Sequence, residues 1–224
     1  MKARDFRWLF LLVVATLLVI GAIAEPTNVG VLAEWSKDGY RFAGGTQGWA
    51  LALSVVIMGL YLLLMYSPLN EPKQSLPGVF RRFVVFWLDF ILAMMLVAPI
   101  LGLIPLFAEW RRTQVFEWNF ERTAPASGDK LVIAAVTLLG FVALVFYYAF
   151  PLIRRRPSPG SCIAGYQIVA DDGRPIDLRK AVLRTLLGLV AACAAYVAPF
   201  VARDRKQGKF WLDRVFQTRA VKLN

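Results

Sequence analysis

The chain has 224 residues, of which 58% are hydrophobic and only 18% are charged, a balance too apolar for an ordinary soluble domain. Its formal net charge is +11, but the basic residues flank long apolar runs, as the positive-inside rule requires, so they indicate membrane topology rather than nucleic-acid binding. Histidine is absent, and no hydrolase, metal-binding or dinucleotide motif is present, so the sequence predicts no enzymatic site, no cofactor and no metal.

The first apolar run, residues 8–24, follows a basic segment and is expected to form a membrane helix with the N-terminus in the cytoplasm. Small residues at 22–24 also fit the cleavage site of a signal peptide, so this alternative stays open. Residues 25–47 are polar and rich in glycine, and we expect a small exposed loop with a hairpin around Lys37-Asp38-Gly39. A second run, 49–66, completes an N-terminal two-helix membrane extension, which we assign to residues 1–76.

The third apolar run, residues 83–107, contains the most informative side chain of the chain. It is 25 residues long with Asp89 as its only charged residue, which is long enough to cross a bilayer. Arg82 precedes Asp89 by seven residues, so both lie on one helix face, roughly 10 Å apart along the axis. A carboxylate at this depth is costly unless it is protonated, paired or facing a wet cavity. Asp89 is therefore the first candidate for a functional site.

The fourth apolar run, residues 131–153, is predicted to be the last complete span. It follows residues 108–130, where four basic and four acidic side chains indicate an amphipathic loop on the non-cytoplasmic side. Tyr147 and Tyr148 near its end fit an interface belt. Three consecutive arginines then stop the run, either as a topology signal or as a clamp for lipid head groups. These arginines are Arg154, Arg155 and Arg156.

The basic loop after this span is predicted to carry a small cytoplasmic β-hairpin. Residues 165–170 have strand composition, Asp171-Asp172-Gly173 fits a tight turn, and residues 174–176 return along the strand. Asp177 is placed to cap a helix that begins at Leu178.

A fifth apolar run, residues 181–202, conflicts with loop charge if it spans once, because the tail with seven basic residues would then lie outside. A re-entrant hairpin bending at Gly188 or Pro199 removes the conflict, and we favour it over a full span. Arg184 in this run either pairs with Asp89 or extends to the membrane surface. The predicted fold is an all-α membrane bundle with four full spans, a fifth re-entrant or spanning segment, and one cytoplasmic β-hairpin.

The order of several short motifs resembles the RDD family of small membrane proteins, named for one arginine and two aspartates. The motifs are Arg82 with Asp89, Pro159-Gly160, the segment from Gly165 to Pro175, Leu183-Arg184, Asp204-Arg205-Lys206, Leu212-Asp213-Arg214 and Thr218. The resemblance covers roughly residues 77 to 222, and residues 77–224 are identified as an RDD-like membrane domain. The family trio would be Arg82, Asp89 and Asp213. Two positions depart from the family pattern: Ser161 follows Pro-Gly in place of a basic residue, and Leu212 precedes Asp213 in place of a histidine.

The resemblance implies an architecture and two hypotheses of function. Cation/proton antiport has been proposed for some family members, which implies transport of a cation or proton with Asp89 titrating. A single chain has few helices to enclose a pathway, so transport would require a homo-oligomer. The alternative is a non-catalytic scaffold or accessory subunit of the inner membrane, whose buried charges hold the helices and whose basic cytoplasmic face binds anionic lipid or a partner. Asp213 is expected either to be solvated or, by the resemblance, to dock on Arg82.

Overall fold

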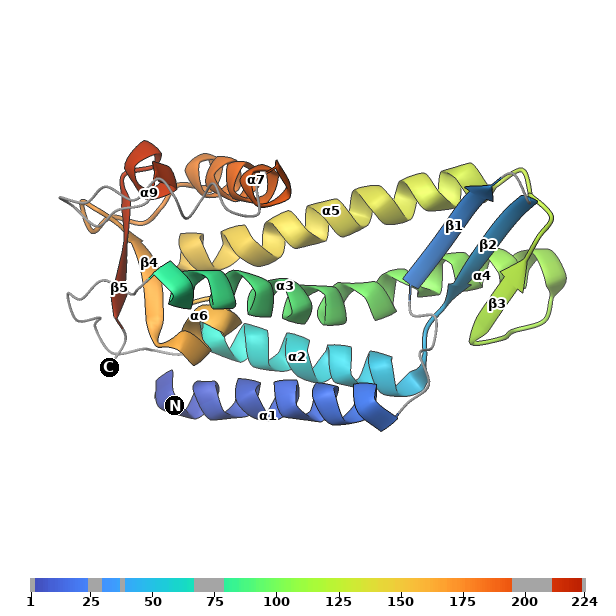
Figure 1. The fold of residues 1–224 in the computed structure, drawn as a ribbon, viewed down its shortest axis with the longest axis horizontal. Coiled ribbons are helices and arrows are strands. Elements are labelled where there is room, and N and C mark those ends of the chain that lie inside the picture. Colours follow the sequence, from blue (N-terminus) through green and yellow to red (C-terminus); the bar gives the residue numbers. More distant parts are fainter. Residues whose placement is uncertain (1–2, 24–29, 37–38, 67–78, 195–210, 223–224) are drawn as a thin grey trace. The chain divides into compact units, whose positions relative to one another are not determined.

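Apolar helices dominate the structure, a computed structural model that describes residues 3–23, 30–36, 39–66, 79–194 and 211–222 (Figure 1). Among these residues, three helical segments are long and apolar enough to cross a membrane, as predicted for the second, third and fourth runs. They are Gly48–Tyr66 (helix α2), Val84–Thr113 (most of α3, Val79–Leu101, with α4, Leu103–Thr113) and Asp129–Arg154 (α5). Helix α1, Ala3–Ile23, covers the first predicted span, and its crossing of a membrane stays a prediction.

The third predicted span consists of two helices that meet at Gly102. The backbone of Gly102 remains helical, with φ −59° and ψ −21°. A Cβ atom at this position would lie 2.4 Å from the carbonyl oxygen of Gly45, closer than real side chains approach. Glycine is therefore needed here because strand β2 packs directly against the junction between α3 and α4.

The chain divides into two compact units, which are described separately. Unit 1 contains Met1–Val14, Leu60–Leu92 and Val145–Asn224, and unit 2 contains Ala15–Gly59 and Ala93–Leu144. Helices α1, α2, α3 and α5 each contribute residues to both units. The sequence-based division at residue 76 stays a prediction.

Unit 2 contains a three-stranded antiparallel sheet in the order β1-β2-β3 (Figure 1). Strands β1 (Gly30–Ser36) and β2 (Gly39–Gly45) form the hairpin predicted in the first polar loop. Strand β3 (Asn119–Arg122) pairs with β2 and was not predicted, since residues 108–130 were interpreted as a loop. The expectation of an exposed loop at 25–47 is also wrong in part, because Phe42 is only 2% exposed. The sheet buries this ring beneath the guanidinium of Arg122, 4.9 Å from the ring centroid.

Unit 1 contains the short helix α6 (Pro159–Ala164), the helices α7 (Leu178–Ala194) and α9 (Trp211–Val215), and a two-stranded sheet. Strand β4 (Tyr166–Ala170) is where the sequence placed it, but its partner is β5 (Thr218–Lys222) and not residues 174–176. Pro175 in the expected return strand lacks the N–H that a ladder needs, whereas β5 is an unbroken run of hydrogen-bonding residues. The predicted cytoplasmic hairpin is therefore wrong in its second strand.

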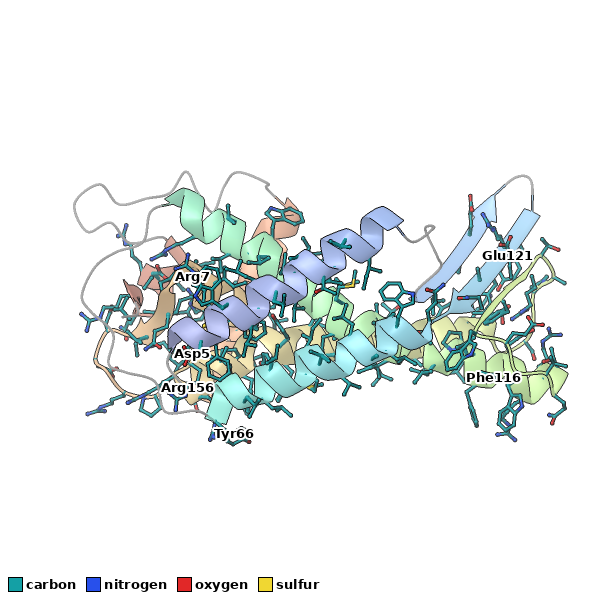
Figure 2. The ribbon with its side chains drawn as sticks, turned by 90° about the horizontal axis from the view of Figure 1, so that it is seen from below. Asp5, Arg7, Tyr66, Phe116, Glu121 and Arg156 are labelled. Atoms are coloured by element: carbon teal, nitrogen blue, oxygen red, sulfur yellow. The ribbon has the colours of Figure 1, made fainter. Side chains whose placement is uncertain are left out.

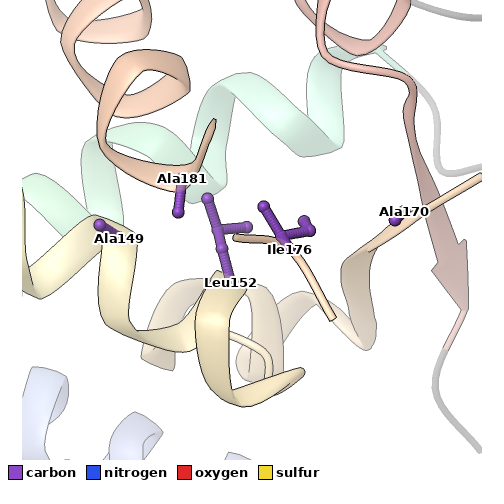
Figure 3. Close-up of a cluster of buried hydrophobic side chains, with 5 residues drawn as sticks. All are labelled: Ala149, Leu152, Ala170, Ile176 and Ala181. Atoms are coloured by element: carbon purple, nitrogen blue, oxygen red, sulfur yellow. The ribbon is translucent and has the colours of Figure 1, made fainter. Parts of the chain in front are cut away.

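A small apolar core joins three elements of unit 1. Figure 3 shows Leu152 of α5, Ile176 of the loop after β4 and Ala181 of α7 grouped together, with Ala149 and Ala170 beside them. All five side chains are at most 7% exposed. A second cluster, Val85, Tyr166 and Ala220, joins the start of α3 to strands β4 and β5. These contacts hold α6, α7 and the β4–β5 sheet against α3 and α5.

Helix α7 begins as the sequence predicted. The Asp177 carboxylate accepts a hydrogen bond from the backbone N–H of Arg179, at 3.2 Å, and so caps the helix start. The helix continues through Gly188, so the first of the two suggested bends is not used. Pro199 lies outside the described residues, and the choice between a re-entrant and a spanning segment for 181–202 stays a prediction.

Candidate functional site

Asp89 of α3 is buried, 2% exposed, and its carboxylate accepts three hydrogen bonds. Oδ1 accepts from the backbone N–H of Gly160 at 2.7 Å and from the hydroxyl of Tyr147 at 3.2 Å. Oδ2 accepts from the Ser158 hydroxyl at 2.5 Å. Within the described part of the chain Asp89 forms no ion pair. Neutral dipoles therefore solvate this carboxylate in place of water.

The first turn of α6 supplies two of these three donors. Ser158 is the N-cap residue, accepting from the N–H of Ser161 at 3.2 Å, and Pro159 follows it at the start of the helix. The first N–H groups of a helix have no intrahelical acceptor, so the N–H of Gly160 is available to Asp89. A Cβ at Gly160 would lie 2.8 Å from Cγ of Asp89. The Ser-Pro-Gly sequence thus gives the carboxylate its donors and the space to approach them.

Asp89 is also one end of a chain of hydroxyl groups. Ser158 donates its single proton to Asp89, so the 2.7 Å contact between the hydroxyls of Ser158 and Ser161 has Ser161 as donor. Ser161 is hydrogen-bonded in turn to Tyr166 of β4. Burial raises the pKa of Tyr166, and the nearby positive charge of Arg82 offsets only part of that rise. The Tyr166 hydroxyl is therefore protonated at neutral pH.

A second buried carboxylate, Asp213 of α9, binds two arginines. Its Oδ2 accepts from Nη1 of Arg82 at 2.6 Å, and its Oδ1 accepts from Nη2 of Arg184 at 2.8 Å. Thr218 at the start of β5 donates to the same Oδ1 at 3.3 Å and accepts from Nε of Arg184, also at 3.3 Å. The Asp213 side chain is 1% exposed and each arginine side chain 12%. This Arg82–Asp213–Arg184 cluster joins α3, α7, α9 and β5.

The charge state of Asp213 follows from two opposing effects. Burial alone would raise its pKa, but the positive charges and hydrogen bonds of Arg184 and Arg82 together outweigh burial and hold the pKa below its usual range. The carboxylate is therefore ionised at neutral pH, and the cluster carries one negative charge between two positive ones.

The part of the chain that contains both aspartate sites also matches a known protein family. A model of the RDD family matches residues 76–216, more than half of the 224 residues. The chain belongs to the RDD family. Searches among curated proteins and among solved structures gave no match. The match includes Arg82, Asp89 and Asp213. Arg82 and Asp213 form an ion pair, whereas Asp89 lies in a separate site and bonds to neutral donors.

For this RDD protein the predicted partners were correct in one case and wrong in another. Docking of Asp213 on Arg82 is confirmed, and the alternative of a solvated Asp213 is wrong. Pairing of Asp89 with Arg184 is wrong, because Arg184 pairs with Asp213. Extension of Arg184 to the membrane surface stays a prediction. Arg184 follows the buried Ala181 by three positions on α7, and its side chain, 12% exposed, meets Asp213 of α9. Asp89 needs no arginine, since the start of α6 satisfies it.

Two residues of the Asp89 site were missed by sequence reasoning. Tyr147 was interpreted as part of an interface belt, but it is 2% exposed and faces Asp89. Ser158 was not singled out, although a serine before Pro-Gly is the usual start of a helix and could have indicated a free pair of donors. Gly160 was named only as part of the Pro159-Gly160 motif, and its N–H is also a donor to the carboxylate.

The three arginines at the end of α5 lie apart from both carboxylates in the sequence. Arg154 lies over the ring of Tyr66, 4.5 Å from its centroid, and Figure 2 labels Tyr66 at the end of α2. Arg155 adopts a positive φ of 53°, and the N–H of Arg156 donates to the carbonyl of Pro151 at 2.8 Å, which ends α5. Burial, and secondarily the charge of Arg154, lowers the pKa of Arg156. Their contact with lipid head groups stays a prediction.

Proposed function

We propose that this RDD protein is a non-catalytic scaffold or accessory subunit of the inner membrane. The observation that supports this choice is that both buried aspartates are fully engaged by the chain's own residues. Asp213 joins four elements through two arginines, and Asp89 holds the start of α6 against α3. Such charges stabilise one arrangement of helices and strands, because moving any element would leave a buried charge without partners.

The basic residues of unit 1 give this scaffold a surface for anionic lipid or an acidic partner. Several of them are exposed, and they come from the end of α5, the loop after β4, the start of α7 and the end of α9. The exposed residues are Arg154, Arg155, Arg174, Arg179 and Arg214. Each basic residue near an anionic membrane surface contributes about 1 kcal/mol of attraction, so a group of this size is sufficient to select anionic lipids. With the N-terminus in the cytoplasm, this surface would face the cytoplasmic leaflet.

A second candidate function, transport of a proton or cation, is favoured by one specific observation. Tyr147, Asp89, Ser158, Ser161 and Tyr166 are linked by hydrogen bonds, and such a chain of hydroxyl groups could pass a proton to and from a carboxylate. Transport would need water at both ends of this chain and, we expect, assembly of several copies.

Ion flux separates the two functions. The purified protein is reconstituted into liposomes that enclose a pH-sensitive dye, and wild type is compared with Asp89→Asn and with the control Asp172→Asn, an exposed loop carboxylate. The scaffold function predicts no flux above empty liposomes for any variant, with a lowered thermal midpoint for Asp89→Asn alone. Flux by the wild type that Asp89→Asn abolishes, while its thermal midpoint is unchanged, would establish transport instead.

Lipid preference is measured separately, by native mass spectrometry of protein released from bilayers with equal amounts of anionic and neutral phospholipid. We expect a preference for the anionic lipid that Arg154→Gln with Arg155→Gln reduces. The control pair, Arg111→Gln with Arg112→Gln, changes the same net charge within unit 2. An equal reduction by both pairs would show only an effect of net charge and would argue against a defined surface in unit 1.

A further inference from the structure

Unit 2 contains a cavity that neither charge cluster uses. Its volume is about 490 Å³, within the range of ~300–1,000 Å³ that is typical of ligand pockets, and it is partly open. The cavity lies between α3, which contributes Ala93, Val97 and Leu101, and α5, whose contribution runs from Ile133 to Leu144. Val31 and Ala33 of β1 also line it. All of the lining residues belong to unit 2.

The lining has the chemistry of a site for an alkyl chain. Of the side chains that face the cavity, Thr137 alone carries a hydroxyl, and the others are aliphatic, aromatic, glycine or methionine. Both lining helices are among the three segments apolar enough to cross a membrane, so the surrounding medium would be lipid rather than water. An apolar cavity beside hydrocarbon suits an acyl chain better than water, because water there would lack hydrogen-bond partners.

The volume argues against a helix of a second copy as the occupant. A helix is about 10 Å across with its side chains, so 490 Å³ would accommodate roughly 6 Å of it, little more than one turn. An alkyl chain is much thinner and flexible, and it can lie along the lining residues of α5, from Ile133 past Gly140 to Leu144. The cavity volume therefore favours a chain of a lipid over a protein segment.

One charged side chain lies on the same face of α5, one turn before the cavity. Lys130 is exposed and precedes the lining residue Ile133 by three positions, so the two are neighbours on the helix surface. Lys130 has no ion-pair partner among the described residues, whereas the carboxylate beside it, Asp129, is paired with Arg122. A positive charge one turn from an apolar cavity is the arrangement that binds an amphiphile with an anionic head.

We propose that this cavity binds one acyl chain of an anionic phospholipid, with the lipid phosphate at Lys130. The site is independent of the scaffold function, because it uses none of the residues of the two carboxylate clusters. It predicts saturable binding by a small number of lipids, in contrast to the exchangeable lipids that surround any membrane protein.

The test uses the full chain in nanodiscs of phosphatidylcholine that contain a trace of phosphatidylglycerol with a photoactivatable group in one acyl chain. After illumination, mass spectrometry locates the labelled peptides. We expect labelling of α3 and α5 at residues that line the cavity, and we expect excess unlabelled phosphatidylglycerol to compete it away. Labelling that stays constant as competitor is added would overturn the proposal, and this measurement needs no variant.

Two neighbouring positions of α5 provide a matched pair of variants. Thr137→Phe places a ring in the cavity, whereas Leu138→Phe adds a similar ring to a side chain that is 64% exposed and does not line it. We expect a several-fold loss of labelling with Thr137→Phe and none with Leu138→Phe. Equal labelling of both variants, or cross-links between copies in place of lipid labelling, would reject the site.

The head group is tested with Lys130→Gln and with phosphatidylcholine that carries the same photoactivatable chain. Loss of one basic residue near the head group should weaken labelling by the anionic lipid about fivefold and leave the neutral lipid unchanged. Arg111→Gln, an exposed basic residue of unit 2 that is far from the lining in sequence, is the control. Phosphatidylcholine carries a phosphate as well, so equal losses for both lipids would show that Lys130 does not select a head group with a net negative charge and would overturn the anionic part of the proposal.

Discussion

Replacing Asp213 by asparagine should destabilise the fold more than the loss of an exposed carboxylate, because Asp213 is buried and is the shared partner of two largely buried arginines. The change removes the negative charge and leaves Arg82 and Arg184 repelling each other across a neutral amide. Removing one partner of a buried ion pair costs roughly 3–5 kcal/mol. Asparagine keeps one acceptor oxygen, and each arginine side chain is 12% exposed, so we expect the lower end, about 3 kcal/mol.

The free energy of unfolding can be measured by titrating the protein in mixed micelles with a denaturing detergent and following helix content by circular dichroism. Asp172→Asn is the control, because the Asp172 carboxylate lies 4.0 Å from the Arg174 guanidinium and both side chains are largely exposed. Asparagine keeps the side-chain oxygen that accepts from the Arg174 backbone N–H at 2.9 Å. An exposed pair of this kind contributes at most about 1 kcal/mol, so the two variants should differ by at least ~2 kcal/mol.

A double variant identifies the cause of the loss. Arg184→Gln alone removes one of two positive charges, but combined with Asp213→Asn it also removes the repulsion that Asp213→Asn creates. The double variant should therefore lose less than the sum of the single losses, by about 1 kcal/mol or more. Strict additivity, or a loss for Asp213→Asn no larger than that of Asp172→Asn, would refute the assignment of a coupled cluster.

Three other measurements test the same geometry. The pKa of Asp213 is lower in the folded protein than in the unfolded chain. Its contribution to the free energy of unfolding should therefore be complete above the ordinary aspartate pKa and be lost as pH falls through the lower folded value. The free energy of unfolding of Asp213→Asn, measured against pH, should lack this decrease at low pH. Gly160→Ala should cost about 1–3 kcal/mol from overpacking, measured by the same titration, whereas Gly59→Ala, where nothing lies within 4 Å, should be neutral or slightly stabilising; equal effects would contradict the close approach at α6. Burial, followed by the charge of a nearby carboxylate, raises the pKa of the Cys162 thiol to about 12. In a Cys193→Ser variant, where Cys162 is the remaining cysteine, a maleimide should label the native protein slowly at neutral pH and quickly after denaturation. Fast labelling of the native protein would contradict the burial of Cys162.

Local patterns in the sequence predicted the elements near the site better than their partners. Strand β4 and the cap of α7 were predicted from composition and turn chemistry, which depend on a few adjacent residues. The partner of β4 is β5, which begins 48 residues after β4 ends, and only the assembled unit brings them together. The Ser-Pro-Gly start of α6 was readable in the sequence, but nothing local indicated that it faces α3.

The length of the apolar runs determined the class of this protein, a membrane protein with helices at 48–66, 84–113 and 129–154, because crossing a bilayer is a requirement on consecutive residues. The spacing of its motifs also predicted the family. Tertiary structure alone decided which aspartate meets which arginine. Two carboxylates and two guanidinium groups allow several pairings of equal charge balance, and Arg82 and Asp213 are 131 residues apart. The start of α6 satisfies Asp89 with neutral donors, which leaves both arginines to Asp213, and such a choice depends on distances that no local pattern contains.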